Sequence, residues 1–297
     1  MREAAGSNPA VPTNSPPCNA LHGSKESSQL ALSAILISDY MPHIVITNDD
    51  GIYAEGLRAL VHAMKGLGTI SVVAPSQERS ASAQSLTLRQ PIFAEQVAEG
   101  EWAIEGTPAD AMIVAMHRLF THPRPDLVIS GINRGGNMGE NIYYSGTVGA
   151  AMEAVINRVP AFAISVAHRG SGFVYEHAAQ FARRLAELIL EKGAPEGVLL
   201  NVNVPLAWKG GVRFTRQSRK ITRTVLQEGT DPRGRTYYWL NDEQVTASLD
   251  PQSDYAAVLG GAISITPLDL DRTHAVSLNH LSHWAALLES TETLKSR

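Results

Sequence analysis

Short runs of branched aliphatic residues alternate with helical segments from residue 41 onward, and no other feature limits the fold of this chain as strongly. Strand-like runs occur at 43–47, 70–74, 127–130, 161–166 and 198–204. Apolar residues recur at helical spacing in the segments between them, at 57–64, 107–119, 148–157 and 173–190. Strands that alternate with helices predict an α/β fold, in which a mostly parallel sheet is sandwiched by helices.

Two of the helical segments carry specific signals. Thr107 followed by Pro108 predicts a helix start, with the hydroxyl as the N-cap and the proline at the first helical position. In the segment 173–190, the spacing places four apolar residues on the buried face of one long helix: Phe181, Leu185, Leu188 and Ile189.

The first strand-like run ends abruptly in polar residues, because 43–51 has the sequence HIVITNDDG. In open α/β sheets, ligands bind outside the carboxyl ends of parallel strands, so Asp49 and Asp50 are expected where chemistry takes place. Two adjacent carboxylates repel each other unless a cation lies between them or one is protonated, and this favours a divalent metal. The alternative is that one aspartate caps a helix and the other lies in a solvated turn.

Two further segments bring oxygen ligands to the same edge. The second strand is followed by 74–80 (APSQERS), which supplies the hydroxyl of Ser80, and the third strand leads to Asn133 in a glycine-rich loop. This loop enters a helix through 144–147 (YSGT), and backbone N–H groups at a helix N-terminus can bind a phosphate. The glycines match neither the dinucleotide fingerprint nor the P-loop, and such loops often serve only tight turns.

Composition excludes several classes of protein. The formal net charge is −4 and the pI is about 6.2, which argues against a binder of nucleic-acid polymers or membrane surfaces. The chain contains no apolar run of the roughly 18–20 residues needed to cross a bilayer. Cys18 is the only cysteine, so a disulfide framework and a cysteine-ligated zinc site within the chain are excluded. These features predict a cytoplasmic protein.

The two ends of the chain differ from its centre. Residues 1–40 contain four prolines and seven serines and predict a disordered tail, with translation from Met41 as a hypothesis and a signal or transit peptide disfavoured. Near residue 206 the pattern becomes strand-like, and the turn at 231–234 (DPRG) leads into the aromatic run 236–240, so hairpins are expected within about 206–260. The aromatic residues either form a subunit interface or fold back on their own domain. A last strand is predicted at 262–267 and a terminal helix at 278–288.

Several motifs, taken in order, resemble the SurE family of survival-protein nucleotidases. They are 44–51 (IVITNDDG), 73–75 (VAP) with 79–80 (RS), 130–133 (SGIN), 144–148 (YSGTV), 231–234 (DPRG), 254–258 (DYAAV) and 264–268 (SITPL). The resemblance covers residues 41 to about 290 and so implies one SurE-like domain over 41–297, with a Rossmann-like core and a C-terminal β-hairpin extension. It also implies a homodimer or homotetramer held partly by the hairpins.

The same resemblance implies a metal site and an activity. The metal ligands of the family fall on Asp49, Asp50, Ser80 and Asn133, which would bind one divalent cation per subunit, Mg²⁺ or Mn²⁺. The implied activity is hydrolysis of nucleoside monophosphates to nucleoside and phosphate by a 5′-nucleotidase. Activity as a 3′-nucleotidase or an exopolyphosphatase is left open.

The chemistry of phosphate transfer suggests a role for each group. Asp49 or Asp50 would orient or deprotonate the attacking water, or attack phosphorus to give a phospho-enzyme. The phosphate oxygens would meet backbone N–H groups and hydroxyls of the loop, including Gly135, Ser145, Gly146 and Thr147. Asn48 and Asn137 are candidates for substrate contact or for turn residues, and His43 and His62 are expected to be structural.

Two other functions compete with the metal-dependent phosphomonoesterase. One is a regulatory module that binds a nucleotide without hydrolysing it, because fold does not determine function. The other is a glycosyl transferase with a metal-binding acidic pair, but the sequence shows no separate signal for a sugar acceptor.

Overall fold

The computed structural model describes residues 40–168, 170, 172–219, 222–244 and 250–289. The prediction of a disordered tail at 1–40 therefore lies outside the described residues, apart from Tyr40.

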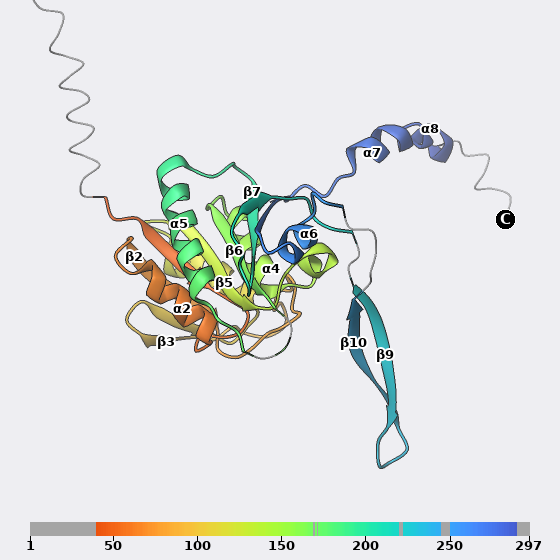
Figure 1. Ribbon diagram of the computed structural model, residues 1–297, viewed down its shortest axis with the longest axis horizontal. Coiled ribbons are helices and arrows are strands. Elements are labelled where there is room, and N and C mark those ends of the chain that lie inside the picture. The colour runs from red at the N-terminus through yellow and green to blue at the C-terminus, as the bar shows by residue number, and fades with distance from the viewer. Residues whose placement is uncertain (1–39, 169, 171, 220–221, 245–249, 290–297) are drawn as a thin grey trace, which may run out of the picture. The chain divides into compact units, whose positions relative to one another are not determined.

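A nine-stranded sheet forms the centre of the described chain, with the strand order β3-β4-β2-β1-β5-β6-β7-β11-β8 (Figure 1). Its strands are β1 (His43–Thr47), β2 (Thr69–Pro75), β3 (Ala94–Ala98), β4 (Glu101–Ile104), β5 (Leu127–Arg134), β6 (Ala161–Ala167), β7 (Val198–Pro205), β8 (Val212–Phe214) and β11 (Ile263–Asp269). Within this sheet of the described residues, only the pairs β3–β4 and β7–β11 are antiparallel. The predicted mostly parallel sheet is confirmed.

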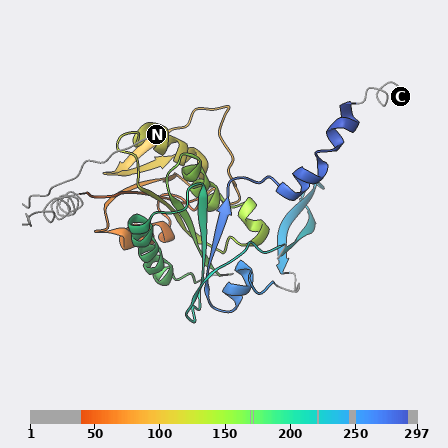
Figure 2. The same cartoon turned by 90° about the horizontal axis from the view of Figure 1, so that it is seen from above.

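Helices cover both faces of this sheet, as the view from above shows (Figure 2). Successive residues of a strand point to opposite faces, so Ile44 and Ile46 pack in one core and Val45 packs in the other. The first core lies under α2 (Glu55–Met64) and α5 (Glu176–Lys192), and the second lies under α3 (Pro108–Val114) and α4 (Gly146–Ile156). Short helical turns lie at 115–119, after α3, and at 139–143, before α4. None of the described helices is both long enough and apolar enough to cross a membrane.

The helix predicted at 173–190 differs from the observed one at its start and on its surface. The helix α5 begins at Glu176, and its residue Leu188 is 52% exposed, so the expected buried position of Leu188 is wrong. Leu185 and Ile189 are buried as expected. The buried face of α5 is formed largely by alanines at 178, 179, 182 and 186, and Leu188 lies outside this face.

The C-terminal region is also more divided than predicted. The hairpin consists of β9 (Thr222–Thr230) and β10 (Thr236–Gln244), which pair only with each other among the described strands. Within the region 206–260, β8 instead joins the main sheet, and α6 (Asp254–Leu259) packs against β7 and β11. The terminal helix expected at 278–288 is two short helices, α7 (Ala275–Leu281) and α8 (Trp284–Glu289).

Close packing at Gly56 brings the end of β5 and the start of α2 together. A Cβ atom on Gly56 would lie 2.1 Å from the carbonyl oxygen of Ile132, so only glycine allows the first turn of α2 to rest on the end of β5.

At the start of β1, the backbone N–H of His43 donates to Asp126, and the imidazole Nε2 bonds to the hydroxyl of Ser71 at 2.9 Å. His43 thus has a structural contact, as predicted.

The start of α3 is held by a capping box. Thr107 Oγ1 accepts from the N–H of Asp110 at 3.0 Å, and the Asp110 carboxylate accepts from the N–H of Thr107 at 2.9 Å. Asp110 also accepts from both the N–H and the hydroxyl of Thr87. Burial alone would raise the pKa of Asp110, but these hydrogen bonds outweigh it and hold the pKa below its ordinary value.

We expect Asp110→Asn to lower the free energy of unfolding by about 1–2 kcal/mol at pH 7, because it weakens the cap and the contacts to Thr87. A carboxyl whose pKa is lower in the folded state stabilises the protein above the unfolded pKa, near 4, and this contribution is lost as the pH falls through the folded pKa. The difference between wild type and variant, measured by chemical denaturation, should therefore shrink below about pH 4. Glu99→Gln, on an exposed turn, is the control, and an equal deficit at every pH would contradict the assignment.

Candidate active site

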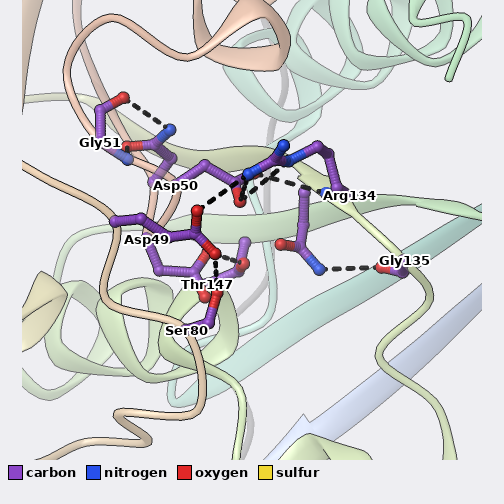
Figure 3. A network of polar contacts seen from close by, with 10 residues as sticks. Asp49, Asp50, Gly51, Ser80, Arg134, Gly135 and Thr147 are labelled. Atoms are coloured by element: carbon purple, nitrogen blue, oxygen red, sulfur yellow. Dashed lines mark hydrogen bonds and ion pairs between the residues drawn. The ribbon is translucent and has the colours of Figure 1, made fainter. Parts of the chain in front are cut away.

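Three adjacent strands, β2, β1 and β5, end at one edge of the sheet, and the sequence-predicted ligands follow them. Asp49 and Asp50 lie in the turn after β1, and Ser80 lies in the segment after β2. Asn133 is the second-last residue of β5. The N-terminus of α4 meets the same edge (Figure 3). The predicted convergence of these segments is present in the structure.

Asp49 lies against the first turn of α4. Its side chain is 5% exposed, and its Oδ1 accepts the hydroxyl of Thr147 at 2.5 Å. A Cβ atom on Gly146 would lie 2.8 Å from the Asp49 Cβ, so glycine is needed for the helix to approach this closely. The positive end of the helix dipole and the hydroxyl thus face one carboxylate.

Burial raises the pKa of Asp49 to about 6. The hydrogen bond from Thr147 lowers this pKa and the charge of Asp50 raises it, but burial has the larger effect. Burial also raises the pKa of Asp50, against the opposing effect of the Arg134 guanidinium. Burial thus disfavours the charged forms of both carboxyls. A cation bound beside them would stabilise those charged forms and lower both pKa values.

Asp50 belongs to a second network that the sequence did not predict. The guanidinium of Arg134 lies 3.4 Å from Asp50 and 3.1 Å from Glu78, and the hydroxyl of Ser80 donates to Glu78 at 2.7 Å. When the Ser80 hydrogen is directed to Glu78, its oxygen lone pairs remain for another partner. Arg134 therefore orients Asp50 (Figure 3), and Glu78 orients Ser80.

A bulge in β5 directs Asn133 into the site. The register with β6 shifts between Gly131 and Asn133, and such an extra residue re-aims the side chains that follow. Gly131 has a φ of 144°, and a Cβ there would lie 2.3 Å from the carbonyl oxygen of Ile164. The Asn133 Nδ2 donates to the carbonyl of Gly135 at 2.8 Å, so Oδ1 is the atom that remains to act as a ligand.

The remaining predicted site residues have structural partners. Asn48 closes the turn after β1 by bonding both the N–H and the carbonyl of Gly51. Ser145 is the N-cap of α4 and accepts from the N–H of Val148 at 3.1 Å. The only hydroxyl hydrogen of Thr147 is donated to Asp49, so Thr147 orients that carboxylate rather than donating to a phosphate.

Asn137 anchors the glycine-rich loop from beneath. Its N–H donates to Asn203, its carbonyl accepts from both Asn201 and Asn203, and its Nδ2 donates to Ser165. All four residues are buried. The Asn137 side chain therefore serves the loop, and sequence patterns missed Asn201 and Asn203 because asparagine inside an apolar strand gives no local signal of its partner.

One further hydroxyl lies at the site. Ser82 Oγ is buried without a hydrogen-bond partner among the described residues, and it lies 2.8 Å from the Cβ position of Gly146, close to Asp49. Buried hydroxyls are normally hydrogen-bonded, so this atom is available to a ligand at the start of α4.

The family model described as Survival protein SurE matches residues 44–224. The chain belongs to the SurE family. The predicted resemblance is thereby confirmed.

Named relatives and a solved structure extend this match. The chain is 45% identical to the 5′-nucleotidase SurE of Geobacter metallireducens over 244 residues, which cover 81% of this chain and 96% of the relative. It is 43% identical to the protein of the same name from Geobacter sulfurreducens over 245 residues, covering 82% and 93%. The crystal structure of the SurE protein from Aquifex aeolicus matches with a TM-score of 0.74 at 35% identity, covering 82% of this chain and all of that one.

The donor set of this SurE-family site suits a hard divalent cation. Asp49, Asp50, Ser80 and Asn133 offer two carboxylates, a hydroxyl and an amide oxygen, and oxygen ligands are those that Mg²⁺ and Mn²⁺ prefer. The described residues contain no group of three or more His, Cys, Asp or Glu side chains placed so that they could hold a metal ion. A cation here would thus depend on the neutral oxygens of Ser80 and Asn133 beside the aspartate pair.

We expect Mn²⁺ to raise the melting temperature at pH 7.5 by about 5–10 °C at 100 times its Kd, because a ligand of the folded state stabilises it. The rise should shrink as the pH falls below about 6, since the cation must then displace a proton from Asp49. Differential scanning fluorimetry measures both effects. Asp49→Asn should lose the response and Asp269→Asn, on exposed β11 surface, should keep it; an equal response in both variants would exclude this site.

Proposed function

We propose that this SurE-family chain is a metal-dependent phosphomonoesterase that hydrolyses nucleoside 5′-monophosphates to nucleoside and phosphate. The observation that carries the proposal is that the adjacent strands β2, β1 and β5 bring Ser80, the aspartate pair and Asn133 to one edge of the sheet, where Asp49 contacts the first turn of α4. The names of the Geobacter relatives support the nucleotide substrate. Activity as a 3′-nucleotidase or an exopolyphosphatase would use the same groups and belongs to the same screen.

The side chains of the chain divide the work on a phosphate ester. Asp49, Asp50, Ser80 and Asn133 would hold a divalent cation, which would neutralise phosphate charge and lower the pKa of a water molecule. The hydroxyl of Ser82 lies at the start of α4, where it and the positive end of the helix dipole can meet a phosphate oxygen. Arg134 pairs with Asp50 and Glu78 and is partly exposed, so it adds a positive charge on the solvent side of the site.

Direct attack by water is the route that these contacts favour. Asp49 is fixed by Thr147, and Asp50 is fixed by Arg134, so both carboxylates are held by neighbours. A carboxylate that attacked phosphorus would have to leave those partners. We therefore propose that Asp49 and Asp50 hold the cation and that one of them accepts the proton of the water, rather than forming a phospho-enzyme.

Phosphate release from adenosine 5′-monophosphate, measured with Mg²⁺ and with Mn²⁺, should fall at least about 10³-fold in kcat/KM for Asp50→Asn. The variant loses one of the two negative charges that hold the cation and its contact to Arg134. Asp269→Asn is the matched control. Full wild-type activity in excess chelator would contradict the proposal, and tight nucleotide binding without turnover under any divalent metal would indicate the regulatory module instead.

We also propose that the chain forms a homodimer or homotetramer through the hairpin. Cross-strand pairing places Leu240 opposite Leu226, with Tyr238 on the same face, whereas Tyr237 and Trp239 point to the other face. All five side chains are exposed, Trp239 by 65%. A two-stranded ribbon with apolar residues on both faces needs a partner surface to bury them.

A cytoplasmic location of the protein stays a prediction.

Trp239→Glu should lower the oligomeric state measured by size-exclusion chromatography with light scattering, because a charge would replace a large apolar contact. The melting temperature of the main domain should change little, since the hairpin strands pair only with each other among the described strands. Leu188→Glu, at an exposed apolar position of α5, is the control. An unchanged oligomer for Trp239→Glu would remove the hairpin from the interface.

A further inference from the structure

Arg134, the last residue of β5, bridges two carboxylates on the solvent side of the site (Figure 3). Its Nε and Nη2 atoms lie 3.4 Å from Asp50 Oδ1, and Nη2 lies 3.1 Å from Glu78 Oε2. We propose that Arg134 exchanges partners: it pairs with Asp50 until a divalent cation binds there, and it then pairs with the phosphate of the substrate. The inference rests on the proposed function, since it concerns the cation and the phosphate of the same site.

The three side chains differ in their freedom to move. The Asp50 side chain is 5% exposed, whereas those of Arg134 and Glu78 are 48% and 54% exposed. Asp50 Oδ2 also faces the backbone N–H of Arg134 at 3.4 Å, and this contact does not depend on the guanidinium. The guanidinium can therefore leave Asp50 while the carboxylate keeps its position.

The contact between Arg134 and Asp50 is weak enough to be replaced. Both nitrogens lie at 3.4 Å from Asp50, beyond the roughly 2.7–2.9 Å of a strong charge-assisted hydrogen bond. Half-exposed ion pairs of this kind contribute little to stability. A divalent cation beside the same carboxylate would repel the guanidinium, so the cation and Arg134 compete for Asp50.

Glu78 keeps the arginine near the site after this exchange. One of its oxygens accepts from the hydroxyl of Ser80 at 2.7 Å, and the other pairs with Arg134. A guanidinium presents parallel N–H groups that match two oxygens of a phosphate. Binding of the cation would thus release the arginine that binds the phosphate, and the two ligands would bind cooperatively through Arg134.

The test measures the two ligands separately by calorimetry on Arg134→Gln. The affinity for Mn²⁺ alone should rise about threefold, because the competing charge is gone. The affinity for inorganic phosphate at saturating Mg²⁺ should fall about tenfold, and Arg134→Lys, which keeps the charge without the planar fork, should lie between. Lys192→Gln, at the exposed end of α5, is the charge-matched control and should change neither affinity. If Arg134→Gln weakens both ligands, Arg134 only orients Asp50 and the exchange is excluded.

A double-mutant cycle tests the part of Glu78. Glu78→Gln keeps an acceptor for the Ser80 hydroxyl but leaves Arg134 to Asp50, so the affinity for Mn²⁺ should fall severalfold. Most of that fall should vanish in the Arg134→Gln background. An equal fall in both backgrounds would mean that Glu78 acts on the cation without Arg134, which would overturn the exchange.

These titrations separate the inference from the proposed function, because neither needs turnover. If the opposed shifts of Arg134→Gln occur but adenosine 5′-monophosphate is not hydrolysed, the proposed function fails and the exchange stands. If the nucleotide is hydrolysed and Arg134→Gln weakens both ligands, the proposed function stands and the exchange fails.

Discussion

The contact between the Asp49 carboxylate and the first turn of α4 is the constraint on which the site depends. It joins the end of β1 to a helix that starts about a hundred residues later, through Thr147 and the close approach of Gly146. Burial raises the pKa of Asp49, and the hydrogen bond from Thr147 acts in the opposite direction. The contact therefore fixes the position of Asp49 and favours its charged form.

A layer of buried polar side chains lies at the same carboxyl edge of the sheet. Thr47 and Ser130 lie opposite each other on β1 and β5, and Asn201 and Asn203 continue the polar layer on β7. The asparagines hold the loop through Asn137, whereas Thr47 Oγ1 and Ser130 Oγ have no hydrogen-bond partner among the described residues. Burying such groups is costly, and their gathering at the carboxyl edge indicates that this end of the sheet is built for binding rather than for stability.

The sequence predicted the features that depend on neighbours in the chain. Periodicity located the five central parallel strands, and Thr107 with Pro108 located the start of α3. It missed β3 and β4 because β3 is mostly exposed and has no alternating pattern, and it misplaced Leu188 because helical spacing does not show how far the sheet extends beneath α5. The meeting of Asp49, Asp50, Ser80 and Asn133 at one edge could be predicted because strand order alone gathers them there.

The roles of individual side chains at the site needed the structure, for a physical reason. Thr147 and Ser145 look equivalent in sequence, as hydroxyls at a helix start, yet one donates to Asp49 and the other caps α4. Arg134 and Glu78 gave no signal, because an ion pair between segments more than fifty residues apart leaves no trace in local patterns. Side-chain direction, rather than residue type, decides which oxygen serves the ligand and which serves the fold.

The arrangement of strands separates the oxygen donors from a neighbouring cavity. The donors follow β1, β2 and β5, whereas a cavity of about 850 Å³ lies over β5, β6 and β7, so only β5 and its loop border both. Side chains at the ends of β6 and β7 can therefore change the shape of the cavity without moving Asp49 or Asp50. The shared loop cannot change as freely, because Gly135 accepts a hydrogen bond from Asn133 and also lines the cavity, while Asn137 fastens the loop to β7. A change in this loop would thus alter the donor set and the cavity wall together.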